Sequence, residues 1–261
     1  MWSFPEIDPV ALQLGPLAIR WYGLMYLAGF VCAYFFIRYR VRQTGLPLSS
    51  EAVADLLFYA VVGVVAGGRL GYVLFYQPGH YLRHPVEIVQ LWQGGMSFHG
   101  GLLGVVLAVL LFCRRRRLQV GPLADILVMA ACFGLCFGRL GNFINAELWG
   151  RVTDVPWGLV FPQAGPLPRH PSQLYQAILE GPVLFSLLAL ISRWRRPVWT
   201  VFFSFVAFYA LFRFLVEFFR QPDAHLGLLG GGLSLGQWLS LPMLLLGLAG
   251  VVWSLCRRPV P

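Results

Sequence analysis

The chain has 261 residues, of which 58% are hydrophobic and only 12% are charged, and its mean hydropathy is +0.68. An average soluble domain carries about 25% charged residues, so this composition excludes a soluble globular protein and indicates a polytopic membrane protein. The net charge is +9, but all 20 basic residues are arginines that gather between the apolar runs. The absence of lysine excludes Schiff-base chemistry. The arginines gather between the spans and are not spread over a folded surface, which argues against a nucleic-acid partner.

The apolar runs predict about seven transmembrane helices, because a bilayer needs about 20 apolar residues per span. In chain order these spans lie near 17–37, 53–76, 98–113, 121–141, 173–192, 198–219 and 234–256. The sequence contains no soluble domain between the spans and no clear internal repeat. We therefore expect one integral membrane domain over residues 1–261. The expected fold class is an all-α polytopic membrane protein.

Arginine clusters follow each odd-numbered span. They are Arg38, Arg40 and Arg42 after the first, Arg114 to Arg117 after the third, Arg193, Arg195 and Arg196 after the fifth, and Arg257 and Arg258 after the seventh. The positive-inside rule then places the N-terminus outside and the C-terminus in the cytoplasm. The outer connections lie near 77–97, 142–172 and 220–233, and the aromatic residues of the second one predict a small head region on the outer membrane surface.

The cysteines and histidines do not form a recognisable metal or disulfide pattern. All five cysteines lie in apolar stretches, where we expect them to act as small packing residues. His80 and His84 are four residues apart, but no H-E-x-x-H motif accompanies them. The sequence therefore predicts neither a metal site nor a cofactor.

Arginines near the outer ends of three spans suggest an anion site. Arg139 ends the fourth span, within CFGLCFGRLGNFINAELWG. In the sixth span, Arg213, Glu217 and Arg220 are spaced i, i+4 and i+7 and share one helix face. Arg69 lies in the second span within GGRLGY, where glycines allow close approach of a neighbouring helix or a ligand.

Two interpretations of these arginines remain open. The arginines can snorkel to lipid headgroups or pair with Glu147, Glu180 and Glu217. Alternatively, several arginines at one depth form a phosphate pocket, since the planar guanidinium binds phosphate through two hydrogen bonds. At that depth the phosphate belongs to a phospholipid, so the second interpretation points to a lipid headgroup facing outward.

A candidate base lies at the start of the third span. In GGMSFHGGLLG, His99 is followed by two glycines that leave space around its imidazole. Histidine exchanges protons near neutral pH, although a histidine at a helix start is often structural. Tyr22 and Tyr26 lie at helical spacing in the first span, where an interfacial aromatic belt is the alternative to a pocket role for Tyr22.

Six segments together resemble the prolipoprotein diacylglyceryl transferases of bacteria. They are WYGLMY at 21–26, GGRLGYVLFY at 67–76, GGMSFHGGL at 94–102, GRLGNFINAELWG at 138–150, LPRHPSQLYQ at 167–176 and RFLVEFFRQPD at 213–223. The segments appear in the family's order and cover the chain from near residue 5 to near 245. The connection before LPRHPSQLYQ is shorter than in some relatives, which affects only the expected head region.

The resemblance implies a seven-span enzyme of the bacterial inner membrane with its N-terminus and active site towards the periplasm. Such an enzyme moves the diacylglyceryl group of phosphatidylglycerol to the lipobox cysteine of a prolipoprotein signal peptide and releases glycerol 1-phosphate. It also implies catalytic roles for His99, Arg139, Arg213 and Glu217, and substrate binding by Tyr22, Asn142, Glu147 and Gly150, to which we add Arg69 from the pocket argument.

Two other function classes remain. A lipid transporter or flippase would need polar residues along a path through the whole membrane, whereas here they crowd the outer half. A non-catalytic phospholipid-binding protein would need the arginines but not His99. Transfer of labelled lipid to a lipobox peptide distinguishes the three classes. The proton acceptor also stays open between His99, Glu147, Glu217 and the departing phosphate.

Overall fold

The structure is a computed structural model. It describes residues 2–257 except 6, 16, 195, 223–226 and 228. Of the arginines discussed above, Arg195 and Arg258 therefore lie outside the described residues. The contacts group the chain into two compact units. The first contains residues 1–37 and 124–261, and the second contains residues 38–123. The single membrane domain expected from the sequence stays a prediction.

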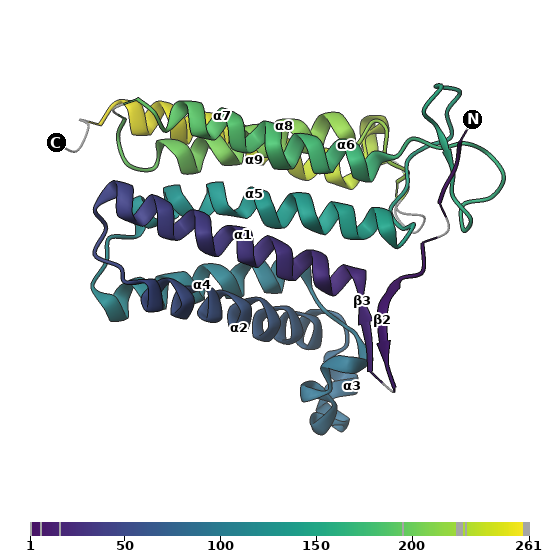
Figure 1. Cartoon of the computed structure of the whole chain (residues 1–261), viewed down its shortest axis with the longest axis horizontal. Coiled ribbons are helices and arrows are strands. Elements are labelled where there is room, and N and C mark those ends of the chain that lie inside the picture. The colour runs from purple at the N-terminus through teal and green to yellow at the C-terminus, as the bar shows by residue number, and fades with distance from the viewer. Residues whose placement is uncertain are drawn as a thin grey trace. The chain divides into compact units, whose positions relative to one another are not determined.

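The first unit is built from five helical spans (Figure 1). They are α1 (Trp21–Thr44), α5 (Val120–Ile144), the kinked span α6 (Ser172–Ile178), η3 (Leu179–Val183) and α7 (Leu184–Ile191), then α8 (Thr200–Val216) and α9 (Leu235–Leu255). Helices α8 and α9 lie side by side. A core of Val128, Met129, Leu184, Leu188 and Val201 joins α5, α7 and α8.

The second unit pairs two long helices, α2 (Ser50–Phe75) and α4 (Phe98–Arg116). Between them run the short helices α3 (Pro78–Arg83), η1 (Pro85–Val89) and η2 (Leu91–Gln93). Glycines allow α2 and α4 to approach closely, since a Cβ atom on Gly71 would lie 2.8 Å from the Cα atom of Gly100. Small residues at a helix crossing are typical of membrane helices.

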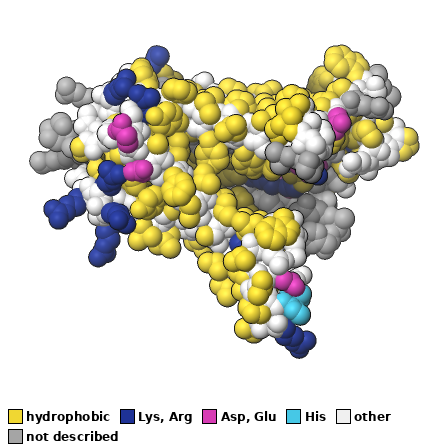
Figure 2. Space-filling model, turned by 60° about the horizontal axis from the view of Figure 1, so that its bottom comes forward, with side chains coloured by type: hydrophobic (Ala, Val, Ile, Leu, Met, Phe, Trp, Pro, Cys, Tyr) yellow, Lys and Arg dark blue, Asp and Glu magenta, His cyan; other side chains and the backbone are white. Residues whose placement is uncertain are grey.

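The helices confirm the predicted spans. Among the described residues, six helical spans are long and apolar enough to cross a membrane, and Thr200–Val216 is a shorter apolar helix. Large apolar side chains are exposed along the helices (Figure 2), for example Phe58, Phe75, Leu103 and Leu245. In water such exposure would be unfavourable, whereas in a bilayer it faces lipid. The protein is therefore a polytopic membrane protein.

The boundary of the first span needs correction, and short strands accompany the helices. Residues 17–20 are not helical but form strand β3 (Leu17–Arg20), which pairs antiparallel with β2 (Val10–Leu14). A second pair joins β1 (Trp2–Ser3) in parallel to β4 (Leu159–Val160). These strands are too short for periodicity to reveal them, and β1 and β4 are far apart in sequence.

The N-terminal segment and the connection after α5 form a small ordered region. Phe4 packs with Ala146, Leu159 and Phe161, all of which are buried. This contact anchors the start of the chain on the connection that the sequence predicted to be an ordered head region.

One buried carboxylate inside a span, that of Asp125, is satisfied by capping a neighbouring helix. Asp125 of α5 accepts hydrogen bonds from the backbone N–H groups of Trp199 and Phe202 at the start of α8. Its Oδ2 also lies 3.7 Å from Nη1 of Arg196. A carboxylate at a helix N-terminus is favourable because it compensates unpaired N–H groups.

Candidate active site

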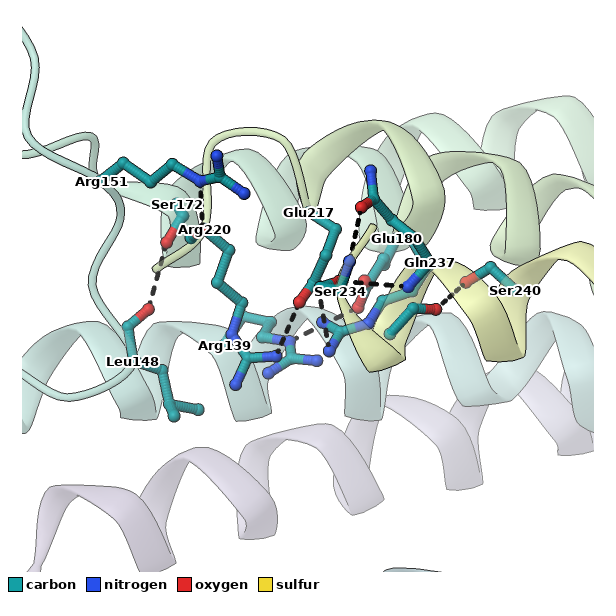
Figure 3. A network of polar contacts seen from close by, with 12 residues as sticks. Arg139, Leu148, Arg151, Ser172, Glu180, Glu217, Arg220, Ser234, Gln237 and Ser240 are labelled. Carbon is teal, nitrogen blue, oxygen red and sulfur yellow. Dashed lines mark hydrogen bonds and ion pairs between the residues drawn. The ribbon is translucent and has the colours of Figure 1, made fainter. Parts of the chain in front are cut away.

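A cluster of buried charges joins three helical segments of the first unit (Figure 3). Arg139 comes from α5, Glu180 from the π-helical turn η3, and Arg213 and Glu217 from the end of α8. Nε of Arg139 lies 3.5 Å from Oε2 of Glu180, and Nη2 of Arg213 lies 3.4 Å from Oε2 of Glu217. Arg220 adds a third guanidinium, with Nη1 3.6 Å from Oε1 of Glu217. Three cations and two carboxylates give this charged cluster a net charge of one positive unit.

The charged cluster retains unused hydrogen-bonding capacity. Glu180 is fully buried and Glu217 is 3% exposed, so both carboxylates depend on their arginines to offset the cost of burial. Nη1 of Arg213 is buried and has no hydrogen-bond partner among the described residues. A buried donor without a partner is unfavourable unless a ligand or water occupies it. The cluster can therefore accept an anion.

The end of α8 is held by backbone contacts with the connection after α5. The spacing of Arg213, Glu217 and Arg220 predicted one helix face, and the two ion pairs through Glu217 confirm it. Just beyond the helix, the backbone of Arg220 forms a β-bridge with Gly150. Nε of Arg151 donates to the Arg220 carbonyl at 3.1 Å.

Gly150 has a backbone role in this arrangement. A Cβ atom at this position would lie 2.5 Å from the His170 carbonyl oxygen and 2.6 Å from the Phe219 carbonyl oxygen. Only a glycine fits between these two backbones without displacement. The geometry therefore gives Gly150 a packing role, and its substrate contact stays a prediction.

Tyr22, Asn142 and Glu147 lie together beside α5. Nδ2 of Asn142 donates to Oε1 of Glu147 at 2.7 Å, and the Glu147 backbone carbonyl accepts a hydrogen bond from Nε2 of Gln173 at 2.6 Å. The Tyr22 ring packs against Gly141, and its hydroxyl lies 3.2 Å from that of Tyr26. Tyr22 also interacts with the side chains of Asn142 and Glu147. The structure thus brings together three residues that were predicted separately.

Several residues of the site were not selected from the sequence. Glu180 was considered there only as one of several ion-pair partners, and its position beside Gly181 and Pro182 is the signal that could have singled it out. Tyr209 interacts electrostatically with four charged residues of the cluster, namely Arg139, Glu180, Arg213 and Glu217. The first turn of α9 contacts Glu217, since a Cβ atom on Gly236 would lie 2.9 Å from its carboxyl carbon.

Arg69 belongs to the second unit, where it is 3% exposed. Its guanidinium donates five hydrogen bonds of 2.5 to 3.3 Å to backbone carbonyl oxygens of residues 87, 88, 90, 94 and 95. A guanidinium has five N–H donors, so no donor remains for a phosphate. In the structure Arg69 therefore holds the segment between α3 and α4, and the ligand role expected from its glycine neighbours stays an untested prediction.

His99 also belongs to the second unit, in the first turn of α4. The helix begins at a cap in which Oγ of Ser97 accepts a hydrogen bond from the backbone N–H of Gly100 at 3.2 Å. The His99 side chain is exposed and its ring makes an edge contact with Phe98. Its imidazole is thus accessible at the start of α4.

An apolar pocket of about 380 Å³ lies in the same unit as the charged cluster. Leu179 and Val216 line it and directly precede Glu180 and Glu217, while Trp157, His170, Tyr175 and Phe219 form its aromatic wall. Burial lowers the pKa of His170, and Asp154 opposes this shift. One unit therefore holds both a charged cluster and an apolar pocket, the two kinds of surface that an amphiphilic ligand requires. Among the described residues, no three His, Cys, Asp or Glu side chains are grouped as metal ligands.

Comparison with known proteins identifies one family. The model of the prolipoprotein diacylglyceryl transferase family matches residues 9–253. A phosphatidylglycerol–prolipoprotein diacylglyceryl transferase of Geobacter sulfurreducens is 59% identical over 259 residues, which cover 99% of this chain and 100% of the relative. Enzymes with the same name from Bordetella avium and Nitrosomonas europaea are 59% and 54% identical, covering 95% and 97% of this chain and 95% and 92% of the relatives.

Proposed function

The chain belongs to the prolipoprotein diacylglyceryl transferase family, and we propose that it transfers the diacylglyceryl group of phosphatidylglycerol to a prolipoprotein cysteine, with the charged cluster as its phosphate site. The chain is a membrane transferase of lipoprotein biosynthesis. The observation that carries the phosphate assignment is the net positive charge of the cluster, in a unit that also holds an apolar pocket. A phospholipid offers one negative phosphodiester and two apolar chains, which match these two surfaces.

The reaction exchanges one bond to carbon for another. The lipobox cysteine sulfur attacks the glyceryl CH₂ carbon that bears the phosphate, so that a C–S bond forms while the C–O bond breaks. The bonding electron pair leaves on the phosphate oxygen, and glycerol 1-phosphate departs with one more negative charge. The thiol proton passes to a base or to the departing phosphate. Because negative charge grows on the leaving group, groups that bind it more tightly in the transition state accelerate the step.

Arg139 and Arg213 are the proposed phosphate ligands. Two observations support this assignment: both guanidinium groups lie in the charged cluster, and Nη1 of Arg213 has no hydrogen-bond partner among the described residues. Glu217 contacts Arg213 and Arg220 and is proposed to hold their orientation. Tyr22, Asn142 and Glu147 form the adjacent polar group, and we assign them to the hydroxyls of the substrate headgroup.

His99 is the proposed proton acceptor. A free cysteine has a pKa near 8.5, so the substrate thiol is mostly protonated at neutral pH and gains from a neighbouring base. The exposed imidazole at the start of α4 supports the assignment. His99→Gln retains hydrogen bonding but cannot titrate, so turnover should fall about 10²–10⁴-fold and recover in part at higher pH. An equal loss of lipid binding without recovery at high pH would transfer the role to Glu147, Glu217 or the phosphate.

We propose that this multi-pass protein lies in the plasma membrane, a location supported by its bacterial relatives, and that its N-terminus and its active site face the periplasm. The arginine clusters after the odd-numbered spans support this orientation. In a background without the five native cysteines, Gly79→Cys and Gln163→Cys should react with an impermeant thiol reagent added outside intact cells. Arg116→Cys should react only after the membrane is opened. Labelling of Gln163→Cys from the cytoplasmic side alone would invert the topology.

The phosphate assignment is tested by replacing the planar guanidinium. Arg139→Lys and Arg213→Lys keep the positive charge but lose bidentate binding, so each should slow transfer of labelled lipid to a lipobox peptide while the protein still inserts. Arg83→Lys, an exposed arginine of α3, is the matched control and should transfer at the wild-type rate. Wild-type turnover in both cluster variants would refute the phosphate site, and a protein that binds lipid without any transfer would be a binding protein.

A further inference from the structure

Glu180 occupies an irregular turn in the middle of the fifth span. The turn η3 (Leu179–Val183) is π-helical, and Gly181 within it has non-helical torsion angles, φ −96° and ψ −106°. Pro182 follows and cannot donate a backbone hydrogen bond. Single π-helical turns inside α-helices are rare and are often found at functional sites. The sequence Glu-Gly-Pro therefore builds a specific distortion around a fully buried carboxylate.

The distortion brings η3 directly against α5. A Cβ atom on Gly181 would lie 2.6 Å from the Cβ atom of Cys136, so a larger residue would force the two segments apart. Arg139 lies three residues after Cys136 and therefore on the next turn of the same face of α5. Glu180 meets it there, with Oε2 3.5 Å from Nε.

The contact engages only one edge of the Arg139 guanidinium. Glu180 binds at Nε, and it is the only hydrogen-bond or ion-pair partner of Arg139 among the described residues. The two terminal nitrogens therefore point away from this contact as a pair of donors, the geometry that binds phosphate through two hydrogen bonds. The Arg139 side chain is 19% exposed and that of Glu180 is 0% exposed, so the arginine, and not the carboxylate, is the accessible member of the pair.

We propose that Glu180 is a positioning residue, which holds Arg139 by Nε so that its terminal nitrogens face the substrate phosphate. This inference rests on the proposed function, because it assumes that Arg139 binds the phosphate. Glu180 itself does not touch the substrate. It acts on the reaction by fixing the direction of the guanidinium and by limiting the charged cluster to one net positive unit, which matches a phosphodiester.

The test is a double-mutant cycle between Glu180→Gln and Arg139→Lys, measured as kcat and KM for lipid transfer by the purified full chain in phosphatidylglycerol-containing nanodiscs. Glu180→Gln keeps the size of the side chain but loses its charge. Displacing a binding group by about 1 Å can slow a reaction about 10²-fold. We expect kcat to fall by that order in the wild-type background. In the Arg139→Lys background, Glu180→Gln should change kcat by only a few-fold, since the lysine side chain has no guanidinium Nε for the carboxylate to hold.

Two comparisons separate positioning from a general loss of structure. Asp125→Asn removes another buried carboxylate of the same unit that pairs with an arginine, so it should lower the melting temperature without changing kcat per folded molecule. Glu180→Asp keeps the charge with a shorter reach and should retain more activity than Glu180→Gln. Equal slowing by Glu180→Gln in both Arg139 backgrounds, or wild-type kcat for Glu180→Gln alone, would overturn the inference. Wild-type kcat for Arg139→Lys would instead refute the proposed phosphate site.

Discussion

The five hydrogen bonds of Arg69 predict a large effect from a conservative substitution. Arg69→Lys keeps the charge, but an ammonium group has three donors and can retain at most three of the five contacts with residues 87–95. A hydrogen bond to a charged group contributes about 1.5–3 kcal/mol, so the loss of two should cost roughly 3–6 kcal/mol. For a protein of this size each kcal/mol corresponds to about 2–4 °C, and we expect the melting temperature to fall by at least about 6 °C.

Thermal unfolding in detergent and limited proteolysis measure this effect. The released segment should be cleaved faster by chymotrypsin at the exposed Trp92, whereas the control Arg83→Lys should melt and digest as the wild type does. A ligand role for Arg69 makes a different prediction, namely a raised KM for phosphatidylglycerol at an unchanged melting temperature. That outcome would refute the structural explanation of Arg69.

Three further predictions concern packing, capping and pH. Gly71→Ala should separate α2 from α4 and destabilise the protein, since its Cβ atom would lie 2.8 Å from Gly100 Cα. The control Gly23→Ala places its Cβ atom in open space beside α1. In thermal unfolding it should be neutral or stabilising by up to about 1 kcal/mol. Asp125→Asn should cost about 1–2 kcal/mol by the same measurement, because it loses its ion pair and weakens the cap of α8. Burial lowers the pKa of His170, so the folded state favours the neutral ring. The stability of the protein should therefore fall as the pH drops below the ordinary histidine pKa of about 6.5. A His170→Gln variant with the same pH dependence of stability as the wild type would contradict this.

The spans and their order followed from the sequence because the bilayer imposes a length and an apolar composition on each of them. The paired contacts on α8 were predictable for a related reason, since residues four apart on one helix are neighbours whatever surrounds them. Arg213 and Glu217 illustrate this, as their ion pair is local. The motifs that contain Tyr22, Asn142 and Glu147 predicted a site, but the contacts among these residues could be found only in the folded structure.

Positions that depend on distant segments could not be derived in this way. Arg69 and Arg139 are both arginines of apolar spans beside glycines, and the same argument assigned both to phosphate. The structure separates them, because the carbonyl oxygens that saturate Arg69 come from residues 18 to 26 positions later in the chain.

Arg139 instead meets a carboxylate 41 residues away that leaves its terminal nitrogens available. Hydrophobicity and periodicity record which face of a helix is apolar, but they do not record which distant backbone or side chain that face will meet. The sequence by itself therefore determined the membrane spans and the helix faces that carry charge. Only the tertiary structure decided which distant backbone or side-chain groups meet each arginine, since the partners of a buried charge are set by long-range packing.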